Sequence, residues 1–122
     1  MPAKRPSPTP SSKKTAVYRV DIFQVPVQAR RRFLDRVEET HRVLRTIPGF
    51  VEDHILERSS GPGACTIATI AIWENEAAVS HARTVIGAWH RRTGFSPQKL
   101  MSDLGIEAAI GDFRPVELAM TV

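Results

Sequence analysis

The chain has 122 residues, 42% of them hydrophobic and 25% charged, and a formal net charge of +4. This length fits one domain, on a prior of roughly 100–200 residues per domain, and the composition is that of a globular protein. The excess charge lies in the first fifteen residues, where Lys4, Arg5, Lys13 and Lys14 occur without any acidic residue. Because the rest of the chain has equal numbers of basic and acidic residues, we expect no nucleic-acid partner.

A single cysteine, Cys65, excludes an intrachain disulfide and a multi-cysteine metal site. No segment reaches the ~18 consecutive apolar residues of a membrane span. The basic N-terminus lacks the apolar stretch of a secretory signal, so we expect a cytoplasmic protein without membrane contact. Residues 1–15 are rich in Pro, Ser and Lys, which favours a disordered tail. The predicted domain covers residues 16–115, and the apolar C-terminal tail, 116–122, is expected to pack on a partner.

The first predicted strand covers residues 17–23, where polar and apolar side chains partly alternate. We expect Tyr18 and the alternate apolar side chains after it to form the inward face. Arg19 and Asp21 would then lie on the opposite face. Pro26 stops strand pairing and suits the first turn of a helix.

The next elements are a long helix and two strands. Over residues 27–46, apolar side chains and His41 recur at helical spacing opposite a surface of mixed charge. This pattern predicts an amphipathic helix packed on a sheet. Gly49 follows a proline and helps to end the helix. Residues 50–58 and 65–73 predict two strands joined by a short turn, and therefore an antiparallel hairpin.

A second long helix is predicted to begin after Asn75, a good N-cap residue, and to end at Gly94. A short helix over residues 96–104 and a last strand over 106–114 complete the domain. The order is therefore β-α-β-β-α-α-β, the split βαβ or ferredoxin-like arrangement of the α+β class. It implies an antiparallel four-stranded sheet with helices on one face. The other face, with apolar positions of the hairpin, needs a further layer, so we expect a homodimer.

Four short motifs, in this order and spacing, resemble the antibiotic biosynthesis monooxygenase-like (ABM) domain family. They are FQVP at 23–26, PGFV at 48–51, WENEA at 73–77 and GDFR at 111–114. The resemblance covers about residues 17–114 and implies the dimeric α+β barrel of that family.

The family includes cofactor-independent oxygenases of polyphenols, quinol oxygenases and haem-degrading enzymes. Haem-degrading members use an asparagine on the first strand. The sole asparagine of this chain, Asn75, lies elsewhere, so the resemblance does not imply haem degradation. It implies a cofactor-independent monooxygenase of a small aromatic, polyphenolic or quinol substrate. No cofactor is expected, and the histidine spacing predicts no metal site.

The candidate catalytic residues are Tyr18, His41, Trp73 and His81. An inward Tyr18 would hydrogen-bond a phenolic ligand, and Trp73 would form an aromatic wall. His41 suits a general base near neutral pH. His81 lies one turn into the second long helix, where the resemblance places a histidine. Three of these residues have a plain structural alternative: His41 and Trp73 as core side chains, and His81 at the surface.

Two further expectations complete the prediction. His90 adjoins Arg91 and Arg92 and is expected to be solvated. In the absence of a sharp catalytic motif, a second hypothesis stays open, in which the protein is a non-catalytic dimeric module. Such a module would bind a small hydrophobic ligand or a partner protein.

Overall fold

The computed structural model describes residues 15–118, and the predicted tail segments 1–14 and 119–122 lie outside the described residues. The elements follow the predicted order, with an added single 3₁₀ turn, η1, before the first long helix. They are β1 (Val17–Pro26), η1 (Val27–Ala29), α2 (Arg30–Leu44), β2 (Phe50–Ser59), β3 (Ala64–Trp73), α3 (Glu76–Thr93), α4 (Pro97–Leu104) and β4 (Glu107–Phe113).

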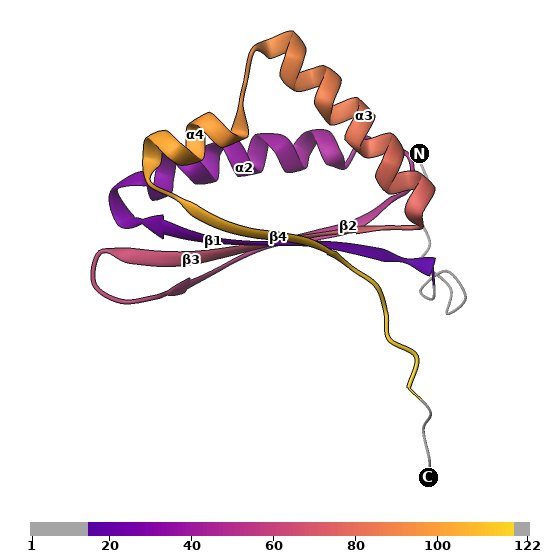
Figure 1. Cartoon of the computed structure of the whole chain (residues 1–122), viewed down its shortest axis with the longest axis horizontal. Helices are drawn as coiled ribbons and strands as arrows, with labels where there is room; N and C mark the ends of the chain where they lie inside the picture. Colours follow the sequence, from indigo (N-terminus) through magenta and orange to yellow (C-terminus); the bar gives the residue numbers. More distant parts are fainter. Residues whose placement is uncertain (1–14, 119–122) are drawn as a thin grey trace, which may run out of the picture.

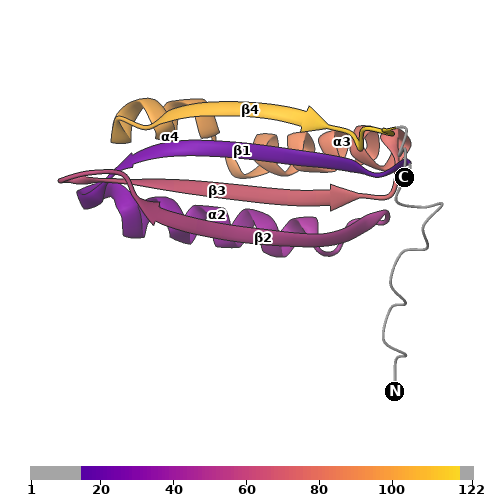
Figure 2. The ribbon, with the colours of Figure 1, turned by 90° about the horizontal axis from the view of Figure 1, so that it is seen from below.

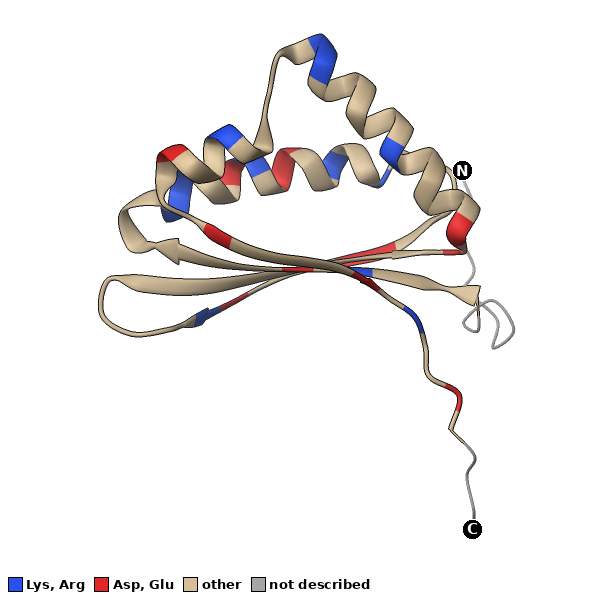
Figure 3. Cartoon of the chain, in the orientation of Figure 1, with Lys and Arg blue, Asp and Glu red and all other residues tan. Residues whose placement is uncertain are grey.

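The strands form one antiparallel sheet in the order β2-β3-β1-β4, and the helices lie on one side of it (Figure 1). The predicted α+β ferredoxin-like class is therefore confirmed. Figure 2 looks at the sheet from the other side, where no described helix covers the strands. Charged residues of both signs follow α2, as predicted for a helix with one solvated face (Figure 3).

The side of β1 that faces the helices differs from the prediction. Val17, Phe23 and Val25 are buried under the helices, so the odd-numbered side chains of this strand point that way. Arg19 and Asp21 share this face and line a cavity beneath the helices. The predicted orientation was wrong because both faces of this central strand are apolar, and alternation alone cannot rank them.

Tyr18 consequently lies on the open face, paired with Phe113 of β4 and Ile72 of β3. The even-numbered apolar residues of β1 and β3 lie on this same face. The open face therefore has an apolar centre formed by Val20, Ile22, Ala68, Ile70 and Ile72.

The buried core divides into two clusters along the sheet. One lies under α2 and α4, and includes Phe23, Phe33 and Ile67. The other lies under the first half of α3, and includes Val17 and Trp73. The stretch of β1 between these clusters carries polar side chains on the helix side.

Gly49 joins α2 to β2 in a conformation that only glycine adopts easily. Its φ is +90°, and an added Cβ would lie 2.4 Å from Cβ of Ala78 in α3. We expect Gly49→Ala to lower the free energy of unfolding by roughly 2–4 kcal/mol, from backbone strain plus overpacking. Gly63→Ala is the control, because φ is +75° there but no atom lies within 4 Å. Urea unfolding should show the larger loss at Gly49, and equal losses would contradict the steric account.

Candidate active site

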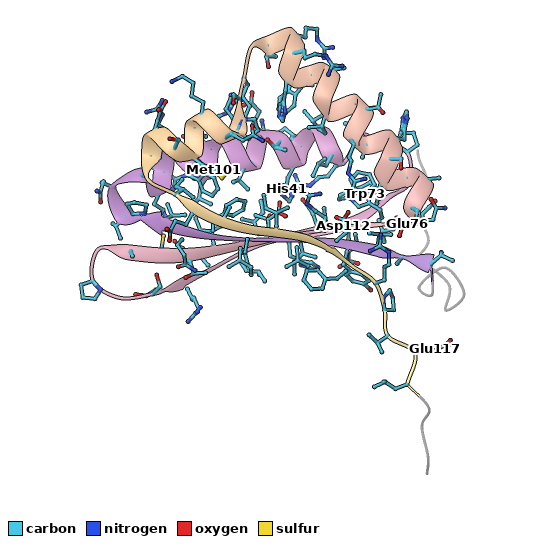
Figure 4. All side chains as sticks on the ribbon, viewed as in Figure 1. His41, Trp73, Glu76, Met101, Asp112 and Glu117 are labelled. Atoms are coloured by element: carbon cyan, nitrogen blue, oxygen red, sulfur yellow. The ribbon has the colours of Figure 1, made fainter. Side chains whose placement is uncertain are left out.

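A cavity of about 290 Å³ lies between the sheet and the helices. Phe23 of β1, Phe33 of α2 and Leu100 and Met101 of α4 form its apolar part and belong to the first core cluster. The rings of Phe23 and Phe33 meet edge to face at 4.8 Å. Figure 4 shows Met101 and His41 on the helix side of the sheet, with His41 toward the middle. The apolar part of the cavity is thus lined by aromatic and aliphatic side chains.

Polar side chains line the cavity beyond Phe23. Arg19 and Asp21 come from β1, Thr69 from β3 and His41 from α2. Asp21 and Thr69 are direct neighbours in the antiparallel register. A ligand in this cavity would thus contact apolar side chains at one end and polar side chains at the other.

His41 is held by an acidic partner on β2. Its Nδ1 lies 2.8 Å from Oδ2 of Asp53, and the two side chains are 8% and 11% exposed. Arg45 also donates to Asp53, with Nη2 at 2.8 Å from Oδ2. Burial by itself would raise the pKa of Asp53, but the hydrogen bonds from Arg45 and His41 hold that pKa below its usual value.

The ionised Asp53 can only accept a hydrogen bond, so Nδ1 of His41 carries the proton and donates it. The lone pair of the neutral ring is then on Nε2. His41 lines the cavity, and no hydrogen bond to Nε2 is found within residues 15–118. An imidazole fixed in this way can accept a proton from a ligand.

Asp21 is the carboxyl group inside the cavity. Burial raises its pKa, although the neighbouring Arg19 and His41 act in the opposite direction. Arg19 Nε donates to Oδ1 of Asp21 at 3.0 Å, and its Nη1 reaches Oδ1 of Asp112 at 3.4 Å. Arg83 of α3 is the last member of this network of ion pairs, with Nη2 at 2.5 Å from Oδ2 of Asp112. These pairs tie β1, β4 and α3 together beside the cavity.

Asp21→Asn is expected to stabilise the protein near neutral pH. The pKa of Asp21 is raised in the folded state, so folding favours its protonated form. The resulting contribution to the free energy of unfolding is present below about pH 4 and is lost as the pH rises through the folded pKa. The variant should therefore gain in melting temperature relative to wild type between about pH 4 and pH 7. Asp35→Asn, on the exposed side of α2, is the control. A gain in melting temperature that does not grow with pH would contradict the burial of the Asp21 charge.

Trp73 belongs to the core and also borders a second hollow. It is 3% exposed, and its ring packs edge-on against Phe50 at 5.5 Å. It lines a hollow of about 300 Å³ under α3, which shares Arg19 and His90 with the cavity. The structure thus places the candidates His41 and Trp73 in adjoining hollows. Figure 4 shows both side chains on the helix side of the sheet.

The other two candidates lie elsewhere. Tyr18 is on the open face of the sheet, so its expected inward orientation was wrong. His81 is exposed on α3 and lines neither of these hollows.

His90 was predicted to be solvated, and the structure instead places it in the wall of both hollows. Its Nε2 is buried. The sequence did carry the signal, because Ala82, Ile86 and His90 are spaced by four on one helix face. The two arginines after His90 obscured this signal.

Within residues 15–118, no group of three or more His, Cys, Asp or Glu side chains is placed to hold a metal ion. No helix in this range is long and apolar enough to cross a membrane.

The sheet order and the helical layer give a fold similar to that of solved structures named as antibiotic biosynthesis monooxygenases or cofactor-independent oxygenases. The resemblance seen in the sequence is thereby confirmed at the level of the fold. No protein-family model matches the chain, and no curated protein matches it.

Several solved structures are similar to this chain over nearly the whole domain. SnoaB, a cofactor-independent oxygenase from Streptomyces nogalater, has a TM-score of 0.62 and 20% identity, and covers 85% of this chain and 96% of its own. A putative antibiotic biosynthesis monooxygenase from Deinococcus radiodurans has a TM-score of 0.62 and 13% identity, covering 87% and 98%. The de novo designed protein Foldit4 also matches, with a TM-score of 0.55 and 15% identity, covering 83% and 99%. Since a designed chain shares this fold, the chemistry has to be argued from the site.

Proposed function

We propose that the protein is a cofactor-independent monooxygenase that oxidises a small planar phenol or quinol in the cavity beneath α2 and α4. The observation that carries this proposal is the His41–Asp53 pair, which presents a free imidazole nitrogen beside an aromatic cavity. The similarity of fold to SnoaB supports it.

The reaction needs a base and a substrate that can itself reduce dioxygen. His41 Nε2 removes the proton of the substrate hydroxyl, and Asp53 stabilises the imidazolium that forms. The electron-rich phenolate gives electrons to dioxygen, and a C–O bond forms at a hydrogen-bearing ring carbon ortho or para to the oxygen. The proton on His41 completes the hydroperoxide, which then loses water. A ring C–H thus becomes a carbonyl group, with one oxygen atom in the product and the other in water.

The volume of the cavity indicates the size of the substrate. At about 290 Å³ it lies just below the roughly 300–1,000 Å³ typical of small-molecule sites. One or two fused rings would fit it, whereas a longer ring system would have to extend past Arg19 and His90 into the second hollow.

Oxygen consumption with a panel of naphthols, quinols and larger polyphenols tests the proposal. A metal chelator in the buffer suppresses spontaneous oxidation by trace metals. We expect saturable oxygen uptake that is fastest with the one-ring and two-ring compounds. Binding without oxygen uptake across the panel would support the non-catalytic module instead.

We also propose that a second copy covers the open face of the sheet. The apolar centre described above is flanked by exposed Leu56 on β2 and Phe113 on β4. A monomer seldom leaves so large an apolar surface in water, and two such faces can pack as a sheet sandwich. The C-terminal segment, with Glu117, extends toward this side of the sheet (Figure 4). Exposed Val116 and Leu118 in this segment would reach a partner placed there.

A further inference from the structure

Arg36 of α2 and His90 of α3 meet at the wall of the cavity, where each has a buried nitrogen without a hydrogen-bond partner. These atoms are Arg36 Nε and His90 Nε2, and no other buried side-chain nitrogen or oxygen within residues 15–118 lacks a partner. Both residues pack on Phe95. The guanidinium carbon of Arg36 lies 3.7 Å from the centre of the Phe95 ring, and the His90 ring centre lies 5.3 Å from it. An unpaired buried polar group destabilises a fold, and a ligand that enters between the two side chains would supply the missing partner.

Both side chains of this pair can donate hydrogen bonds, which suits an anionic ligand. Burial, and then the nearby Arg36, lower the pKa of His90, so its ring is neutral at about pH 7 and can donate one hydrogen bond. Arg36 shares part of its charge with Glu39, with Nη1 at 2.7 Å from Oε1. Two guanidinium groups line the cavity, and the other one, Arg19, is paired with Asp21 and Asp112.

We propose that Arg36 and His90 bind a carboxylate carried by the aromatic substrate, which makes the substrate class a hydroxyaryl carboxylate. This inference rests on the proposed function and narrows its substrate. The carboxylate accepts charge-assisted hydrogen bonds from the guanidinium and from the imidazole. Phe95 packs beside it, and the ring system extends along α2 toward His41. The hydroxyl group of the same ligand then reaches His41, which lies on α2 together with Arg36.

Anaerobic calorimetry with two matched compounds tests this inference separately from catalysis. One compound is naphthol, and the other is a hydroxynaphthoate with its hydroxyl and carboxylate on different rings. The wild-type protein should bind the hydroxynaphthoate about tenfold or more tightly than naphthol. Arg36→Met and His90→Leu should each remove most of this preference, measured as the ratio of the two affinities in the same variant.

Arg42→Met is the matched control, because Arg42 is an exposed arginine of the same helix that pairs with Glu38. It should keep the full preference. If Arg36→Met fails to fold by circular dichroism, His90→Leu carries the test, since His90 makes no ion pair within the described residues.

Equal binding of the two compounds by the wild-type protein would overturn the carboxylate site, as would binding of neither at millimolar concentration. A preference that survives in every folded variant of this pair would also overturn it. Oxygen uptake with naphthol but no carboxylate preference would leave the proposed oxidation in place and remove only this inference. A carboxylate preference without any oxygen uptake would keep the carboxylate site and remove the proposed oxidation.

Discussion

His41→Gln is expected to lower kcat for the proposed oxidation by about a hundredfold to ten-thousandfold, the usual contribution of a general base. Glutamine still reaches the Asp53 carboxylate with an amide N–H, so the local structure is preserved. It offers no nitrogen that accepts a proton near neutral pH. Initial rates of oxygen uptake at saturating substrate measure the effect.

His81→Gln is the matched control, since His81 is exposed on α3 and lines neither hollow. Its kcat should stay within about twofold of wild type, as for most surface substitutions away from a site. If His81→Gln were as damaging as His41→Gln, or if His41→Gln kept its activity, the base would not be His41.

Asp53→Asn separates positioning from proton transfer. The asparagine amide can donate to Nδ1 of His41, which favours the tautomer with its proton on Nε2 and thereby blocks the base. We expect kcat to fall while KM changes little, because Asp53 does not line the cavity. A change confined to KM would assign Asp53 a role in substrate binding.

Ile70→Asp is expected to convert the proposed dimer into a monomer. Ile70 lies on β3 at the centre of the open face, between Val20 of β1 and His54 of β2. A dimer would bury two unpaired carboxylates there, which should weaken association by about a thousandfold or more. Light scattering after size exclusion at micromolar concentration measures the mass.

Val27→Asp is the control for Ile70→Asp, because Val27 is an exposed apolar residue on η1, outside the sheet. It should leave the dimer intact. A wild-type protein that is monomeric in this experiment would contradict the proposed partner of the open face.

The order of the elements could be predicted because local signals mark their ends. Asn75 caps α3 by accepting a hydrogen bond from the backbone of Ala78 at 2.9 Å, and Ser96 caps α4 in the same way through Lys99 at 3.2 Å. Gly94 and Gly105 end these helices in the left-handed conformation. Such signals involve neighbours in sequence and need no knowledge of the tertiary structure.

The His41–Asp53 pair could not be predicted, because a β-bulge decides which way Asp53 points. The pairing of β2 with β3 shifts between Phe50 and Glu52. Strict alternation from Phe50 would turn His54 toward the helices, whereas the extra residue turns Asp53 there instead. A shift of one residue exchanges the two faces of a strand, and no residue type at this position signals it.

Mass spectrometry of the product formed under isotopically labelled dioxygen tests the central claim most directly. The protein is assayed with its best substrate in chelator-treated, unlabelled water. The proposed mechanism predicts one labelled oxygen atom in each product molecule at early times, with formation of this product slowed by His41→Gln. A product without the label, or label incorporated equally fast without the protein, would contradict a monooxygenase centred on His41.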